Sequence, residues 1–241
     1  MSHSARDFEF KGLRAHVAQP ETSTKAGVLM LSTIRGVDAE LKQMCGTLAD
    51  VGMTALAWDP FSAYPLDTPH EEKLNIARKL LEDEPTRKEQ LLWLRYMQEE
   101  LWLNSIGVMG LCMGGRACFL VAAVEPRIRA LVAYYPSIRE HIEPPETLDA
   151  VALAQEVRCP VQLMYPKRDH VTSNTTLARL RASLEARTAP TIVQFFPEAD
   201  HGFMDAVRQE QRSENIAAAK LAWPQTMAFL QAALSPDQAV V

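Results

Sequence analysis

The stretch Gly110–Gly115 constrains the fold of this chain more than any other. It reads Gly-Leu-Cys-Met-Gly-Gly and stands between an apolar run typical of a strand, 105–109, and a run typical of a helix, 116–123. A chain that passes from strand to helix over so few residues must turn sharply, and the central residue, Cys112, is then expected to take a strained conformation with positive φ. Glycines two positions before and after it remove side chains that would collide, and the last glycine lets the helix approach the strand.

The rest of the chain alternates strand and helix patterns. Apolar runs typical of buried strands occur at 26–31, 53–58, 106–109, 128–135, 160–165 and 191–196. This alternation predicts an α/β fold, a doubly wound and mostly parallel sheet flanked by helices. Residues 7–17 alternate apolar and polar around Gly12, which predicts an N-terminal hairpin at the sheet edge. We expect one domain over residues 1–241, with frayed ends at 1–6 and 235–241.

Composition restricts the partners. A formal net charge of -5 argues against nucleic acid and against an anionic membrane. The four cysteines lack metal-ligand spacing, so we expect reduced thiols, a cytoplasmic protein, no bound metal and no cofactor. The polar first residues show no secretory leader. The expected partner is a small molecule, and the expected state is a monomer or a small homo-oligomer.

Three residues with the chemistry of nucleophilic catalysis each follow a predicted strand. Cys112 follows the strand at 106–109, Asp169 follows the strand at 160–165, and His201 follows the last strand. The carboxyl ends of parallel strands meet at one edge of a sheet, where active sites of such folds lie. The order nucleophile, acid, histidine is the chain order of the α/β-hydrolase triad. We therefore predict that Cys112 is the nucleophile, His201 its base and Asp169 the group that orients the base.

The sequence resembles the dienelactone hydrolase (carboxymethylenebutenolidase) family of the α/β-hydrolase superfamily. The resemblance rests on the Gly110–Gly115 stretch, on Arg-Asp-His-Val at 168–171, on Ala-Asp-His-Gly-Phe at 199–203 and on Tyr134-Tyr135. It implies an α/β-hydrolase fold over most of the chain and the same three catalytic residues. It also implies an oxyanion hole formed by the backbone N–H groups of Ile34 and Met113.

At two positions that the resemblance implies for the substrate site, this chain differs from the family pattern. Dienelactone-cleaving members carry a glutamate where this chain has Thr33, and an arginine that holds the substrate carboxylate where this chain has Asp205. Arg78 corresponds to a second arginine of that kind, and Arg35 is a candidate to replace the missing one. The residues expected to contact substrate are Thr33, Arg35, Arg78, Tyr134, Tyr135, Phe203 and Asp205.

The expected function is hydrolysis of a small ester or lactone through an acyl-cysteine intermediate. Two alternatives remain open at this point. One is acyl transfer, or another carbonyl cleavage, on the same three residues. The other is a thiol-sensing or ligand-binding protein without catalysis.

Overall fold

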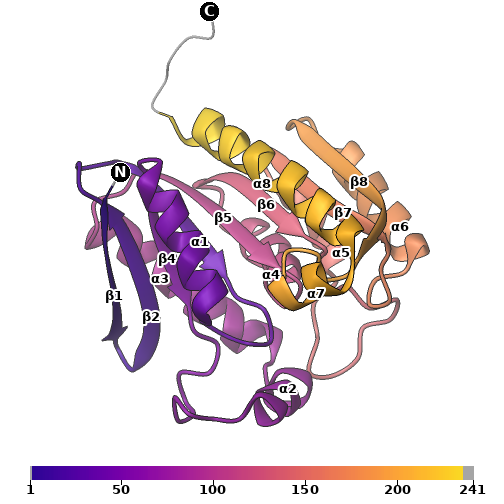
Figure 1. Ribbon diagram of the computed structural model, residues 1–241, viewed down its shortest axis with the longest axis horizontal. Helices are drawn as coiled ribbons and strands as arrows, with labels where there is room; N and C mark the ends of the chain where they lie inside the picture. The colour runs from indigo at the N-terminus through magenta and orange to yellow at the C-terminus, as the bar shows by residue number, and fades with distance from the viewer. Residues whose placement is uncertain (1, 236–241) are drawn as a thin grey trace, which may run out of the picture.

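One sheet of eight strands organises the chain in the computed structural model, which describes residues 2–235. The strands are β1 (His3–Phe10), β2 (Leu13–Pro20), β3 (Ala26–Leu31), β4 (Thr54–Trp58), β5 (Ser105–Leu111), β6 (Ile128–Tyr134), β7 (Val161–Arg168) and β8 (Thr191–Asp200). Their order across the sheet is β1-β2-β4-β3-β5-β6-β7-β8 (Figure 1). All pairs from β4 to β8 are parallel, whereas β2 runs antiparallel to both β1 and β4. The predicted mostly parallel sheet with an N-terminal edge hairpin is confirmed.

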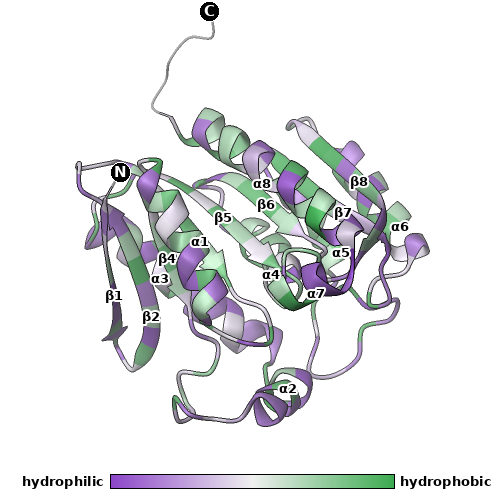
Figure 2. Cartoon of the chain, viewed as in Figure 1, coloured by the Kyte–Doolittle hydropathy of each residue, from purple (hydrophilic) through white to green (hydrophobic). Residues whose placement is uncertain are grey.

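Helices cover both faces of this sheet. They are α1 (Ala39–Asp50), α2 (His70–Lys79), α3 (Asp83–Glu99), α4 (Met113–Ala122), α5 (Ala150–Leu153), α6 (Asn174–Glu185), α7 (Ala206–Gln211) and α8 (Ser213–Leu234), with a short 3₁₀ turn, η1 (Ala154–Glu156). Buried side chains of α1 and α8 form one apolar cluster with the sheet, and those of α3, α4, α5 and α6 form the other. Hydrophobic residues accordingly concentrate in the central strands (Figure 2). The layers are those of an α/β-hydrolase.

The N-terminus differs from the expectation of a frayed end at 1–6. Residues 3–6 belong to β1, which pairs along its whole length with β2, from His3 opposite Pro20 to Phe10 opposite Leu13. The side chains of His3–Asp7 are exposed, so the segment has the composition of a solvated tail although its backbone is paired. The expected fraying of residues 236–241 lies outside the described part of the chain.

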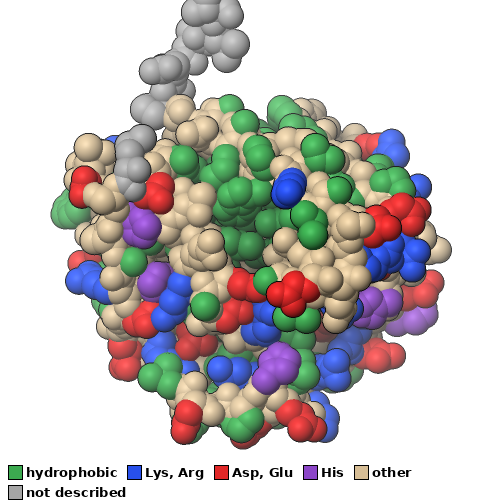
Figure 3. Space-filling model, in the orientation of Figure 1, with side chains coloured by type: hydrophobic (Ala, Val, Ile, Leu, Met, Phe, Trp, Pro, Cys, Tyr) green, Lys and Arg blue, Asp and Glu red, His purple; other side chains and the backbone are tan. Residues whose placement is uncertain are grey.

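Helix α2 is attached to the rest of the molecule by few buried side chains. Only Ile76 of this helix is buried. Figure 1 shows α2 projecting at one end of the molecule, and Figure 3 shows charged side chains of both signs over that part of the surface. The first residue of the helix, His70, nevertheless reaches the cavity described below.

Candidate active site

Cys112 occupies the one-residue turn between β5 and α4. Its backbone has φ 56° and ψ −115°, so the predicted positive φ is confirmed. A non-glycine residue held in such a region costs on the order of 1–3 kcal/mol and persists only where the surroundings impose it. The turn points the side chain away from the packed strand and leaves the thiol half-buried, while the other three cysteines are buried.

The glycines around Cys112 impose this turn. A Cβ at Gly110 would lie 2.2 Å from the carbonyl oxygen of Gly114, and a Cβ at Gly114 would lie 1.9 Å from the carbonyl oxygen of Leu31. A Cβ at Gly115 would lie 2.8 Å from the carbonyl oxygen of Tyr134. No real Cβ approaches backbone this closely, so glycine is required for contact between α4 and the ends of β3 and β6.

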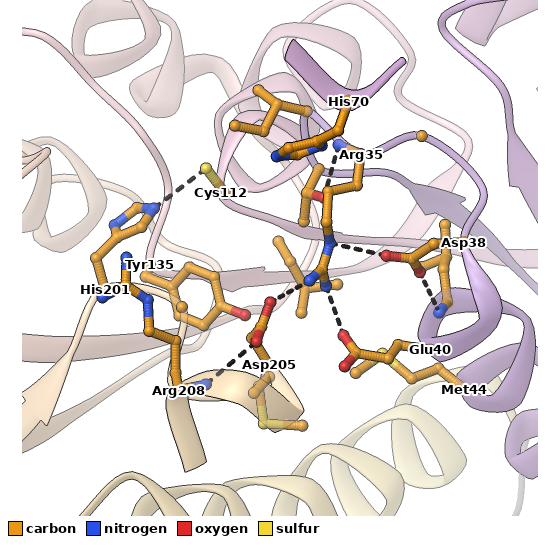
Figure 4. A pocket seen from close by; sticks show the side chains of 17 residues that line it. Arg35, Asp38, Glu40, Met44, His70, Cys112, Tyr135, His201, Asp205 and Arg208 are labelled. Carbon is orange, nitrogen blue, oxygen red and sulfur yellow. Dashed lines mark hydrogen bonds and ion pairs between the residues drawn. The ribbon is translucent and has the colours of Figure 1, made fainter. Parts of the chain in front are cut away.

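A chain of hydrogen bonds runs from the thiol to a carboxylate. Sγ of Cys112 lies 3.1 Å from Nε2 of His201 (Figure 4). On the other side of the ring, Nδ1 of His201 lies 2.9 Å from Oδ2 of Asp169. The Asp169 side chain is fully buried, and its Oδ1 also accepts the N–H groups of Val171 and Thr172. These bonds fix the carboxylate, which in turn orients the imidazole. The structure therefore brings together the three residues that the sequence predicted as a triad.

The electrostatics favour a protonated His201. Burial works against the charged form, but hydrogen bonds to Asp169 and Cys112 and the negative charges on both outweigh it and raise the pKa of His201 to about 9. The raised pKa favours a protonated imidazole ring at neutral pH. The ring faces a sulfur at the N-terminus of α4, where the helix dipole favours negative charge.

A cavity of about 260 Å³ opens over Cys112 and His201. Of the other residues predicted for the site, Thr33, Ile34, Arg35, Tyr135 and Asp205 line it. Tyr135 packs edge-on against the His201 ring at 5.1 Å between centroids (Figure 4). The backbone of Tyr135 has φ 35°, a second strained residue at this end of the sheet.

The two N–H groups predicted as an oxyanion hole have no acceptor among the described residues. Met113 is the first residue of α4, where backbone N–H groups have no intrahelical partner. Ile34 lies in the turn after β3, two residues beyond Ser32, and the close approach of Gly114 to Leu31 and Ser32 packs the start of α4 against that segment. Both donors thus belong to backbone that meets beside the thiol.

Thr33 has a structural role in the same turn. Its Oγ1 accepts the N–H of Arg35 at 3.1 Å, and its carbonyl accepts the N–H of Gly36 at 3.0 Å. The sulfur of Cys112 has its hydrogen-bond contact with His201, at the distance given above, and not with Thr33.

Arg35 has partners other than the substrate carboxylate predicted for it. Its Nε lies 2.8 Å from Asp38, its Nη2 lies 2.5 Å from Glu40, and its Nη1 contacts Asp205 (Figure 4). Since each guanidinium nitrogen already meets a carboxylate, Arg35 is not a free anion-binding group. The sequence identified Arg35 and Asp205 separately but did not predict that they pair.

Three residues predicted to contact substrate do not line the cavity. The Tyr134 hydroxyl is buried and bonds Thr226 of α8 at 2.6 Å. Phe203 is fully buried and packs behind Tyr135, with 5.2 Å between ring centroids. Arg78 is exposed in the last turn of α2. The structure therefore does not bring these three predicted side chains to the cavity at Cys112.

Two basic side chains at the cavity were not among the residues predicted from the sequence. His70 enters from the start of α2, and Arg208 enters from α7. Arg208 is exposed and has no carboxylate within ion-pair distance in the described part of the chain. No motif marks either residue, because α2 and α7 follow loops of irregular sequence.

The described residues contain neither a cluster of metal ligands nor a membrane-spanning helix. Among residues 2–235, no three His, Cys, Asp or Glu side chains gather as a metal site would require. Within the same residues, no helix has the length and apolar character needed to cross a membrane.

Comparison with known proteins places the chain in a family. The model of the dienelactone hydrolase family matches residues 13–234. Carboxymethylenebutenolidase of Rhodococcus opacus is 24% identical over 229 residues, which cover 92% of this chain and 87% of that protein. A carboxymethylenebutenolidase homolog of Xenopus tropicalis is 22% identical over 214 residues, covering 87% of this chain and 83% of its own.

A solved structure shares the fold. The crystal structure of a putative dienelactone hydrolase from Klebsiella pneumoniae superposes with a TM-score of 0.78 at 22% identity, over 95% of this chain and 99% of that one. With the family model covering both the turn at Cys112 and the loop at His201, the chain belongs to the dienelactone hydrolase family.

Proposed function

We propose that this protein hydrolyses small esters or lactones through an acyl-cysteine intermediate. The observation that carries the proposal is the contact of 3.1 Å between the Cys112 thiol and a histidine that a buried aspartate orients. Membership of a hydrolase family supports the reaction class. The two unpartnered N–H groups beside the thiol, those of Ile34 and Met113, support chemistry at a carbonyl carbon.

In the acylation step His201 takes the proton of the Cys112 thiol across the contact of 3.1 Å between Nε2 and Sγ. The thiolate of Cys112 attacks the carbonyl carbon, and the oxyanion that forms is held by the N–H groups of Ile34 and Met113. The C–O bond of the ester then breaks, and the proton of His201 passes to the leaving alkoxide. A thioester on Cys112 and an alcohol result; in a lactone the alcohol stays attached to the acyl group.

Deacylation needs a neutral His201, and acylation itself provides one. Two of the causes that raise the pKa of His201 are the hydrogen bond and the charge of Cys112. Both are lost when the sulfur carries an acyl group, so the pKa falls and the imidazole can take a proton from water. The resulting hydroxide attacks the thioester, the C–S bond breaks, and the proton on His201 again faces a thiolate.

The charges at the cavity favour an acyl group without a carboxylate. The guanidinium of Arg35 is paired with three carboxylates, those of Asp38, Glu40 and Asp205. The other cationic side chain at the rim of the cavity is that of Arg208. A carboxylate placed beside Asp205 would be repelled. We therefore expect neutral esters to be better substrates than matched esters that carry a carboxylate.

One variant and a matched pair of ester substrates test the proposal. Cys112→Ala is expected to abolish turnover of p-nitrophenyl butyrate with an unchanged circular dichroism spectrum, and mass spectrometry of the wild type after acid quench is expected to show an acyl adduct on Cys112. Retained turnover in Cys112→Ala contradicts the proposed nucleophile. Mono-p-nitrophenyl glutarate is expected to react with lower kcat/KM than p-nitrophenyl valerate, the uncharged ester with the same five-carbon acyl chain, and a preference for the glutarate would contradict the substrate class.

A further inference from the structure

The side chains of Arg35, Asp38, Glu40 and Asp205, here named the Arg35 cluster, form one connected ion-pair group on the cavity wall. They come from three places: the turn after β3, the start of α1 and the start of α7 (Figure 4). In sequence, Arg35 and Asp205 are 170 residues apart. The cluster is partly buried, with 30% of the Arg35 side chain and 21% of the Asp205 side chain exposed.

Every carboxylate oxygen of the cluster has a donor. One oxygen of each carboxylate meets the guanidinium, and the other accepts a backbone N–H: Leu41 to Asp38 at 2.9 Å, Ala206 to Glu40 at 3.0 Å and Arg208 to Asp205 at 3.2 Å. Asp38 and Asp205 are thereby the N-caps of α1 and α7. Because all six carboxylate oxygens already have donors, we interpret the cluster as a rigid structural link between the two turns and not as a ligand-binding site.

The two turns that this connection joins carry groups of the proposed reaction. Arg35 directly follows Ile34, and the bonds of Thr33 described above hold both residues in one tight turn. Asp205 ends the turn that follows His201, since its N–H bonds the carbonyl of Gly202 at 2.8 Å. The Arg35 cluster therefore links the backbone that presents the Ile34 N–H to the backbone that presents the imidazole.

We propose that Arg35 is a positioning residue that, through Asp205, fixes the Ile34 N–H relative to the Cys112–His201 pair. The inference rests on the proposed function, because it concerns the oxyanion that forms there. Nothing else in the described part of the chain bonds the side chain of Arg35. Without the cluster, the turn at Ile34 would keep the two bonds to Thr33 and the bond from the Asp38 N–H to the Gly36 carbonyl, none of which reaches the turn after His201.

Two reactions of the same thiol separate positioning of the oxyanion donor from any other effect. Acylation by p-nitrophenyl acetate passes through an oxyanion, whereas alkylation by iodoacetamide displaces iodide at a saturated carbon and forms none. We expect Arg35→Met to lower the acylation rate about 100-fold, the loss that a displacement of about 1 Å brings. The alkylation rate is expected to stay within about twofold, because the thiol and His201 are untouched.

Matched variants sharpen this comparison. Asp205→Asn removes the charge but keeps an N-cap for α7, so it tests the ion pair with the helix intact and serves if Arg35→Met does not fold. It is expected to lower acylation in the same selective way. Arg35→Lys, a single point charge, is expected to restore part of the rate. Arg181→Met, which breaks an exposed pair with Glu185 on α6, is the control and is expected to leave both rates unchanged.

The outcomes are distinct. Selective loss of acylation with KM within about threefold supports the inference. Unchanged acylation in both Arg35→Met and Asp205→Asn overturns it, and so does a parallel fall of acylation and alkylation, which would place the effect on the thiol. A wild-type protein that shows no acylation of Cys112 would instead contradict the proposed function.

Discussion

The guanidinium of Arg116 and the carboxylate of Asp83 meet in two parallel hydrogen bonds, of 2.6 and 2.9 Å, in the buried space between α4 and α3. Asp83 also accepts the N–H groups of Thr147 and Leu148, at 2.7 and 2.8 Å. Arg116 stands one turn after Cys112 on α4. The pair therefore connects the helix that begins at the thiol to α3 and to the loop before α5.

Removing the arginine should destabilise the fold strongly. Arg116→Met leaves the buried Asp83 charge without its partner, and we expect a loss of about 3–5 kcal/mol in the free energy of unfolding in urea. Arg87→Met, which breaks the pair of Arg87 with the half-exposed Glu84, is the matched control and should change it by less than about 1 kcal/mol. Equal losses in the free energy of unfolding for the two substitutions would show that the buried pair stabilises the fold no more than the exposed pair does.

The pair also predicts a response to acid. Burial raises the pKa of Asp83, but hydrogen bonds and the charge of Arg116 outweigh it, so the pKa lies below its ordinary value. A carboxylate with a lowered pKa stabilises the folded state above the unfolded pKa, about 3.9, and this stabilisation is lost as the pH falls through the folded value. Wild-type stability should therefore drop below about pH 4 more steeply than that of Asp83→Asn, measured by urea unfolding at each pH.

Thiol labelling should select one cysteine. Burial raises the pKa of Cys45 and of Cys159 to about 12 and that of Cys118 well above its ordinary value, so these three buried thiols are protonated at neutral pH. Only Cys112 reaches the cavity. Brief treatment of the native protein with iodoacetamide at pH 7 should modify Cys112 alone in peptide mass spectra. Comparable modification of any buried thiol would mean that the native fold opens on that timescale.

The histidine should titrate unusually late. The imidazole of His201 should change protonation near pH 9 in a heteronuclear NMR titration, for the reasons given with its pKa. In Cys112→Ala the hydrogen bond and charge of the sulfur are gone, and the midpoint should move down. An unchanged midpoint in that variant would refute the account of deacylation, which needs the pKa to fall once the sulfur is acylated.

Two glycine substitutions should separate the effect of a steric clash from the effect of a positive φ. Gly114→Ala would place a Cβ 1.9 Å from the carbonyl oxygen of Leu31, so we expect little folded protein and no activity. Gly52 also has positive φ, 89°, but a Cβ there would meet nothing within 4 Å. Gly52→Ala should therefore cost only about 1–2 kcal/mol, measured by thermal unfolding, and should leave activity intact. A folded and active Gly114→Ala would disprove the tight packing of α4 on β3.

The sequence predicted what depends on short stretches of chain. The turn at Cys112 follows from three glycines within six residues, and the sheet follows from apolar runs long enough to identify as strands. The meeting of Cys112, Asp169 and His201 follows from topology alone, because residues at the carboxyl ends of neighbouring parallel strands lie together.

Contacts between distant segments could not be predicted in this way. The partners of Arg35 include Asp205, on a loop far along the chain, and no local pattern indicates an ion pair of that span. The direction of Tyr134 depends on its bond to Thr226, which belongs to the last helix. Residues 3–6 form a strand although their side chains are exposed, because their backbone pairs with β2 and His3 bonds Asp50 of α1 at 2.9 Å.

The contacts that shape the turn at Cys112 all run between main-chain atoms and glycines, and none involves the sulfur. A hydroxyl in place of the thiol would occupy the same position on an unchanged backbone. Replacement of the sulfur by oxygen at position 112 therefore changes one atom and requires no change in the surrounding backbone. Selection at this position can act on reactivity alone, while selection on the fold acts on its neighbours.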